Sequence, residues 1–201
     1  MNDSAGAMIL DAFRDSASSY LAGVATNAKG RRLSEITPRI ERGVWKALAE
    51  AGWMSILVPE SSGGLGLELR HLLTVLEELG KRPLPEPVIA AGVLSVALLE
   101  SLPAGELRDE LLEQAISGER AIGVAWQESA DQPDTAAPIA AVVTEADACS
   151  YVTGVKNWVT PGPDAEGWLV TTQGAEIYWV SADAARSEEH TSELQSHSDL
   201  V

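Results

Sequence analysis

Apolar side chains recur at helical spacing in the first half of the chain and at strand-like spacing in the second half. Positions three and four residues apart predict amphipathic helices. These segments span 8–28, 38–51, 68–79 and 104–117. The segment 88–102 is apolar on nearly all sides, which predicts a helix buried between others.

The ends of these helices carry recognisable signals. Thr37 followed by Pro38 is typical of an N-cap with proline at the first helical position. Gly52 stands where a C-terminal glycine cap belongs, and Gly80 is expected to end the helix before it. Pro103 is expected to interrupt the apolar segment that precedes it.

After Gly118 the pattern changes to short, β-rich segments separated by Gly, Pro, Asp and Asn. The segments are 121–126, 139–143, 151–155, 168–172 and 177–180. Helices followed by strands indicate an α+β fold. We expect an all-α helical domain over residues 1–118 and a partial antiparallel β-barrel or sandwich domain over residues 119–185.

The last sixteen residues, 186–201, have no periodicity and few large apolar side chains. The string Arg186-Ser-Glu-Glu-His-Thr-Ser-Glu-Leu-Gln-Ser-His197 resembles the in-frame translation of a common short-read sequencing adapter. The alternative is a solvated terminal tail. We therefore expect a non-native segment outside the fold, and a natural gene that continues beyond Ala185.

Composition narrows the class of protein. The chain is 45% hydrophobic and 22% charged, so a packed core is possible. A net charge of −16 argues against a nucleic-acid partner, because phosphate binding depends on Lys and Arg. No apolar run approaches the roughly 20 residues of a membrane span. The N-terminal segment 1–8 lacks Lys and Arg, unlike a signal or transit peptide, so we expect a cytoplasmic protein.

Common catalytic templates are absent: the sequence has no dinucleotide fingerprint, P-loop, nucleophile elbow or His-Glu-x-x-His motif. Gly63-Gly-Leu-Gly66 predicts a tight turn rather than a phosphate loop, because no Lys follows it. His71 is expected to be a partly exposed helical histidine. Cys149, the single cysteine, is expected to be a half-buried small residue and excludes a multi-cysteine metal site. We assign no metal ligand.

The segment Gly154-Val-Lys-Asn-Trp-Val-Thr160 places an indole and a hydroxyl one residue apart. On a strand, residues i and i+2 face the same way. One face would then offer a flat π surface and a hydrogen-bond donor, which suits a planar heteroaromatic ligand. Plain packing of Trp158 is the alternative.

Two motifs carry a resemblance to a known family. Leu57-Val-Pro-Glu-Ser-Ser-Gly-Gly-Leu-Gly-Leu67, preceded by Trp45-Lys-Ala-Leu-Ala-Glu-Ala-Gly52, resembles the N-terminal helical domain of acyl-CoA dehydrogenases. Gly154-x-Lys-x-Trp-x-Thr160 resembles the second flavin-contacting motif of the family's central β domain. The resemblance implies FAD as cofactor and oxidation of an acyl-CoA thioester, with a fatty or steroid acyl chain, to the 2,3-enoyl product. Such an oxidoreductase belongs to lipid metabolism.

The resemblance also implies a set of cofactor-binding residues in two loops. Trp158 would pack beside the isoalloxazine ring, and the Thr160 hydroxyl would bond near its N5. The full set is Trp126, Gln127, Glu128 and Ser129 in the first loop, and Trp158, Val159 and Thr160 in the second.

The first loop departs from the family pattern Thr-Glu-Pro-Gly-x-Gly-Ser-Asp. Gln127 replaces the threonine and can still donate and accept hydrogen bonds. Pro133 replaces the serine and has neither a hydroxyl nor an N–H, and Asp131 adds a carboxylate. Heteromeric family members in which one subunit type has lost part of the site, and related flavin-dependent hydroxylases, could both show such changes.

In the family the catalytic glutamate lies in a C-terminal helical domain, which would follow Ala185, so we assign no catalytic residue. We expect a truncated acyl-CoA dehydrogenase-like flavoprotein that is inactive alone and exposes apolar surface. A non-catalytic partner subunit and a flavin-dependent hydroxylase are the alternatives. The full-length form is expected to be a homo- or hetero-oligomer.

Overall fold

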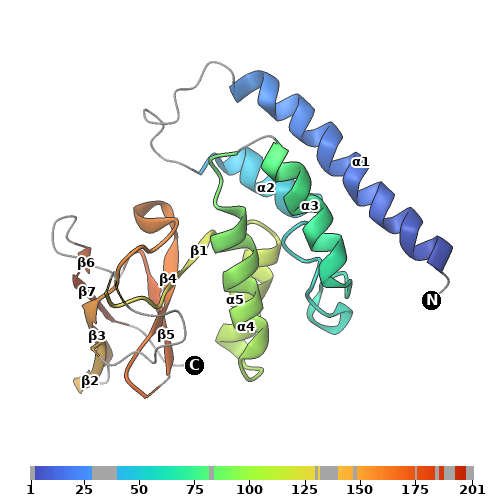
Figure 1. Cartoon of the computed structure of the whole chain (residues 1–201). Helices are drawn as coiled ribbons and strands as arrows, with labels where there is room; N and C mark the ends of the chain where they lie inside the picture. Colours follow the sequence, from blue (N-terminus) through green and yellow to red (C-terminus); the bar gives the residue numbers. More distant parts are fainter. Residues whose placement is uncertain are drawn as a thin grey trace. The chain divides into compact units, whose positions relative to one another are not determined.

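The computed structural model describes residues 3–28, 40–81, 84–129, 131, 140–146, 149–174, 176–183, 186–187 and 193–197. Within them the fold is α+β: helices come first and strands follow from Ile122 onward (Figure 1). The chain forms two compact units. The first unit is Met1–Pro87 with Ile116–Glu119, and the second is Val88–Ala115 with Arg120–Val201. Residues 88–115 thus belong to the same unit as the strands. The boundary expected from the sequence lies later, between residues 118 and 119, where helices give way to strands.

The first unit is helical. It contains α1 (Asp3–Ala28), α2 (Arg42–Glu50), the 3-10 turn η2 (Glu60–Ser62) and α3 (Leu69–Lys81). Figure 1 shows α1 lying along α3. The core of this unit contains Trp45, Leu48 and Trp53, all buried. Tyr20 packs its ring edge-on against Trp53, with the ring centroids 5.7 Å apart.

The predicted glycine cap at Gly52 is confirmed. Gly52 has a φ of 78°, and its N–H donates to the Ala49 carbonyl at 2.8 Å. The start of α2 differs from the prediction, because Glu41 is its N-cap. Thr37 and Pro38 lie outside the described residues.

We expected Gly80 to end α3. The helix instead continues to Lys81. A glycine inside a helix costs only about 1 kcal/mol relative to alanine. The last turn gains support from its side chains, since Lys81 Nζ donates to the Glu78 carboxylate at 2.7 Å.

The glycine-rich segment 61–66 forms a tight turn, as predicted. The Gly64 N–H donates to the Pro59 carbonyl at 3.0 Å, and the Gly66 N–H donates to the Val58 carbonyl at 2.8 Å. A Cβ at Gly64 would clash with the Val58 carbonyl, so only glycine fits there. These two amides donate within the turn itself, which leaves neither of them for a phosphate.

The second unit begins with helical segments: the π-helix η3 (Val88–Leu94), α4 (Ser95–Ser101) and α5 (Glu106–Ile116), whose last residue belongs to the first unit. The expected helix 88–102 is thus divided into a π-helical and an α-helical part. Ile89 and Leu94 are exposed, so the expectation of burial on all sides is wrong for them. Both η3 and α4 contact β1.

Two sheets follow in the second unit. The first contains β1 (Ile122–Ala125), β4 (Gly167–Thr171) and β5 (Ile177–Ser181), in the order β1-β4-β5. The pairing of β4 with β5 is antiparallel, as expected, whereas β1 pairs with β4 in parallel. A parallel pair needs a long connection. The chain between β1 and β4 includes the strands β2 (Val142–Ala146) and β3 (Cys149–Val155) and supplies this connection.

The second sheet has the order β2-β3-β7-β6, in which β6 is Arg186–Ser187 and β7 is Glu193–His197. Its strands β2 (Val142–Ala146) and β3 (Cys149–Val155) form a hairpin, with Val143 opposite Val152. Among the described strands neither sheet closes into a barrel. The core of this unit contains side chains from both sheets, among them Val152, Trp168, Val170, Tyr178 and Val180.

Two short parts of the segment 186–201 are described, and both are strands. Arg186–Ser187 forms β6, and Glu193–His197 forms β7, which pairs antiparallel with β3. An edge strand offers unpaired N–H and C=O groups to any extended segment, whatever its sequence. The pairing therefore carries no information on the origin of the segment, and its resemblance to adapter sequence stays a prediction.

Candidate functional site

The two loops predicted to contact a flavin lie side by side in the second unit. The first loop follows β1 and the second follows β3. The backbone N–H of Asn157 donates to the Gln127 carbonyl at 2.7 Å. The Asn157 side-chain amide donates to the Glu128 carbonyl at 2.8 Å. The structure thus brings together segments that are about thirty residues apart in the sequence.

Trp158 and Thr160 are not on a strand, contrary to our expectation. β3 ends at Val155, and residues 156–160 form the loop that follows it. Trp158 has a φ of 57°, in the left-handed region, which breaks the two-residue alternation of a strand. The argument that their side chains share one face of a sheet therefore does not apply.

The indole of Trp158 nevertheless faces solvent. Trp158 is 76% exposed, and Thr160 is exposed as well, while Val159 is half-buried. Trp45, Trp53, Trp168 and Trp179 are all buried. A tryptophan side chain carries a large apolar surface that proteins usually bury. An exposed indole on a left-handed backbone is consistent with a surface kept for a ligand.

Beneath this loop lies a buried ion pair. Lys156 Nζ lies 3.0 Å from the Glu128 carboxylate, and the two side chains are 1% and 7% exposed. Lys156 also donates to the Trp126 carbonyl at 3.4 Å and to the Thr171 hydroxyl at 3.2 Å. Burial lowers the pKa of Lys156, and the hydrogen bond and charge of Glu128 act in the opposite direction.

The Glu128 carboxylate points into the protein. Its oxygens accept the backbone N–H of Ala140 at 2.9 Å and that of Ala141 at 3.0 Å, in addition to Lys156. The side chain therefore joins the first loop to the segment that leads into β2. From sequence, Glu128 is grouped with the other cofactor-binding residues of the loop, and Lys156 has no assigned role. The position of Lys156 in the Gly154–Thr160 motif was the signal that could have found it.

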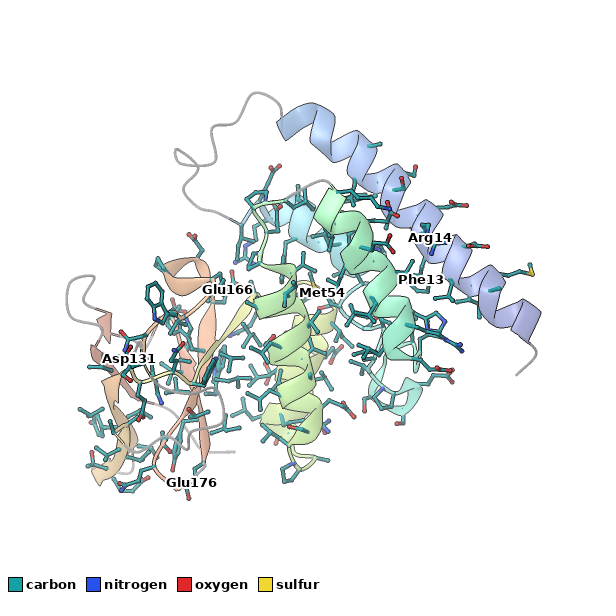
Figure 2. All side chains as sticks on the ribbon, viewed as in Figure 1. Phe13, Arg14, Met54, Asp131, Glu166 and Glu176 are labelled. Atoms are coloured by element: carbon teal, nitrogen blue, oxygen red, sulfur yellow. The ribbon has the colours of Figure 1, made fainter. Side chains whose placement is uncertain are left out.

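The other predicted residues of the first loop are more accessible than the Glu128 carboxylate. Trp126 and Gln127 are half-buried, and Ser129 is exposed. Asp131 is also exposed, and Figure 2 labels it in the part of the molecule that contains the strands. Pro133 lies outside the described residues.

His71 is buried rather than partly exposed, which corrects our expectation. Its Nδ1 lies 3.2 Å from the backbone N of Glu68. Phe13 of α1 covers it edge-on, with the ring centroids 6.2 Å apart; Figure 2 shows Phe13 on the side of α1 that faces α3. The packing of α1, which is distant in sequence, causes this burial. Cys149 begins β3, and its side chain lies outside the described part.

The exposed groups of the two loops define the chemistry available. They offer a flat aromatic face from Trp158 and hydroxyls from Ser129 and Thr160. This combination suits a planar ring with polar edges. Within the described ranges no cluster of His, Cys, Asp and Glu could hold a metal ion. No helix in those ranges is both long and apolar enough to cross a membrane.

Comparison with known proteins assigns a family to most of the helical region. The family model described as "Acyl-CoA dehydrogenase, N-terminal domain" matches residues 6–119. The acyl-CoA dehydrogenase FadE27 of Mycobacterium tuberculosis is 31% identical over 163 residues, which are 79% of this chain and 42% of FadE27. The chain thus spans less than half the length of that relative.

Solved structures extend the likeness to the whole chain. A variant of the Tcur3481-Tcur3483 steroid ACAD is 26% identical with a TM-score of 0.72, covering 96% of this chain and 54% of that one. The ChsE4-ChsE5 complex from Mycobacterium tuberculosis has a TM-score of 0.74 at 22% identity, covering 100% of this chain and 56% of that one. The strands are therefore part of the same shared fold as the helices.

Proposed function

Because the chain belongs to the acyl-CoA dehydrogenase family, we propose that it supplies flavin-binding loops to an enzyme that oxidises an acyl-CoA thioester. FAD is the cofactor of the family. The observation that carries the proposal is the exposed Trp158 indole on a loop that is hydrogen-bonded to the loop after β1. When bound, FAD supplies the acceptor for the hydride that leaves the acyl chain.

The residues present fit a flavin. The Trp158 indole is aromatic surface that the protein's own core leaves uncovered, and a planar ring can stack on it. Thr160 presents a hydroxyl on the same loop, and Ser129 presents one on the first loop. Gln127 offers an amide that donates and accepts. We assign the holding of FAD to Trp158, Val159 and Thr160 in the second loop and to Trp126, Gln127 and Ser129 in the first.

The substrate class follows from the family. We propose an acyl-CoA thioester with a fatty or steroid acyl chain. No residue of this chain is assigned as the base that removes the α-proton. The loops instead bind and orient the cofactor, and Val159, which is half-buried, anchors the exposed pair Trp158 and Thr160 to the protein.

A non-catalytic partner subunit of a heteromeric enzyme is the second candidate. Pro133 replaces a serine of the family pattern, and Ala130 and Gln132 replace its two glycines, which adopt positive φ more readily than other residues. One of the solved neighbours is described as a complex of ChsE4 with ChsE5. In this case the chain would complete the site of a second subunit, and the assembly would be a hetero-oligomer.

Flavin titration and acyl-CoA bleaching test the proposal. The 201-residue chain is titrated with FAD, and the quenching of flavin fluorescence is compared with that of the Trp158→Ala variant. We expect saturable binding that the variant weakens. Binding that is equally strong in the variant, or no flavin binding at all, contradicts the assignment of Trp158.

The natural full-length protein is then mixed with fatty and steroid acyl-CoA under anaerobic conditions. Bleaching of the flavin absorbance in a homo-oligomer supports the dehydrogenase. Bleaching that requires a co-expressed partner supports the second candidate. A flavin that stays oxidised with every acyl-CoA and every partner contradicts both.

A further inference from the structure

Both candidate flavin loops are joined to the same partly buried cluster, which we name the clasp: Glu128, Lys156, Asn157 and Thr171. Lys156 bridges the Glu128 carboxylate on the first loop and the Thr171 hydroxyl on β4. The Thr171 hydroxyl also lies 3.5 Å from the Ala125 carbonyl at the end of β1. The clasp therefore joins segments that follow or belong to β1, β3 and β4.

We propose that Glu128 and Lys156 are positioning residues for the cofactor, which they do not touch. They set the distance between the loop that carries Trp158 and the loop that carries Gln127 and Ser129. The inference rests on the proposed function, because the ligand whose binding depends on this distance is the flavin. It changes the role of Glu128 from a cofactor contact to a support of the loop.

The direction of the side chains supports this role. The Glu128 carboxylate accepts hydrogen bonds from Ala140, Ala141 and Lys156, and its side chain is nearly inaccessible to solvent. A ligand at the surface of the loops would meet the indole and the hydroxyls instead. Asn157 completes the link with two hydrogen bonds to the backbone of the first loop, at 2.7 and 2.8 Å.

The charge balance explains why both partners are needed. A buried ion is tolerated only when its charge and its hydrogen-bonding groups are satisfied. Removing the ammonium of Lys156 leaves the Glu128 carboxylate with backbone donors but without a counter-charge. Water must then enter, or the loop must move outward. Either change displaces Gln127 and Ser129 relative to Trp158, and ordering them again on binding reduces the affinity for the ligand.

Fluorine NMR of the 201-residue chain labelled with fluorotryptophan measures the loop directly. Trp158 is identified by the signal that disappears in Trp158→Phe. Trp179, which is buried in the second unit, reports whether that unit is folded in each variant, and Trp45 and Trp53 report on the first unit. The variants are Lys156→Met, Glu128→Gln and the double variant, with Lys156→Arg as the conservative replacement. Lys46→Met is the matched control, because Lys46 is exposed on α2.

In Lys156→Met we expect the Trp158 signal to shift or broaden while those of Trp179, Trp45 and Trp53 stay in place. The dissociation constant for FAD should rise by about tenfold or more, since the loops are no longer preorganised for the ligand. The double variant should recover part of this loss, because no unpaired buried charge remains. The dissociation constant of Lys156→Arg should lie between those of wild type and Lys156→Met. Lys46→Met should match wild type in both its Trp158 signal and its dissociation constant.

An unchanged Trp158 signal together with unchanged FAD affinity in Lys156→Met overturns the inference. So does a double variant whose losses are the sum of the two single losses, because independent residues are additive. If Lys156→Met does not fold, Glu128→Gln and Lys156→Arg carry the same comparison. A wild-type chain that binds no FAD contradicts the proposed function, while the Trp158 signal still tests the clasp.

Discussion

Gly154 approaches Ala141 so closely that a Cβ at position 154 would lie 2.7 Å from the Ala141 Cα. Ala141 lies just before β2, and its N–H donates to the Glu128 carboxylate at 3.0 Å. The glycine that opens the Gly154–Thr160 motif is therefore needed for a close backbone approach rather than for a special turn. This close approach holds Ala141, just before β2, where its N–H can donate to Glu128 of the clasp.

Gly154→Ala is predicted to destabilise the protein by about 1–3 kcal/mol, as overpacking of a filled site does. The clash is with backbone and the Ala141 Cβ, which cannot rotate away. Urea unfolding followed by circular dichroism measures the loss. Gly80→Ala is the control, because a Cβ at Gly80 in α3 meets no atom within 4 Å. It should stabilise by about 0.5–1 kcal/mol, and equal effects of the two substitutions would contradict the argument.

Trp158→Ala is predicted to change the free energy of unfolding by no more than about 0.5 kcal/mol, because the side chain is mostly exposed. The same variant should lose FAD affinity. Trp168→Ala, which removes a buried indole of β4, should cost about 3–5 kcal/mol. Unfolding curves of both variants and a flavin titration of Trp158→Ala check this. A large loss of stability in Trp158→Ala would show that the indole serves packing.

Ionisation of the Tyr178 phenol is predicted to destabilise the folded protein at alkaline pH. Burial raises the pKa of Tyr178 to about 12 from an ordinary 10.0, with smaller contributions from Glu176 and Glu145. Its hydroxyl donates to the Glu176 carboxylate at 2.9 Å, and Figure 2 shows Glu176 at the turn between β4 and β5. The unfolded chain therefore releases the phenol proton at lower pH than the folded one does.

The resulting stabilisation is fully present below pH 10 and is lost as the pH rises to about 12. Urea midpoints measured across this window should fall more steeply for wild type than for Tyr178→Phe, which has no phenol proton. Lys156, whose pKa is lowered, is present in both proteins and cancels in the difference. Parallel pH profiles would refute the prediction.

The exposed side chains of Leu69 and Leu73 form apolar surface whose removal should improve the solubility of the chain. They lie one turn apart on α3 and are 56% and 54% exposed. Replacing both by Gln should reduce the binding of an apolar fluorescent dye and leave the free energy of unfolding within about 1 kcal/mol. Leu72→Gln, at a buried position of the same helix, should cost about 2–5 kcal/mol. Unchanged dye binding in the double variant would place the apolar surface elsewhere.

Sequence periodicity predicts which segments are helices and which are strands. The segments expected as strands contain or overlap β1 to β5, and the cap at Gly52 appears where the pattern places it. Exact ends are less predictable. The sequence predicts the end of β3 at Val155 but not its start at Cys149, and it does not show that α3 continues through Gly80.

The α+β order and the two loop motifs can be read from the chain alone, since periodicity, caps and turns depend on residues within a few positions of one another. Three features cannot be read from the chain alone: the burial of His71, the parallel pairing of β1 with β4 and the inward direction of Glu128. Each depends on a partner far along the chain: Phe13 for His71, Gly167 for Ile122, and Lys156 for Glu128. A residue's partners and exposure are properties of the folded packing, in which charges and apolar surfaces meet across long stretches of sequence.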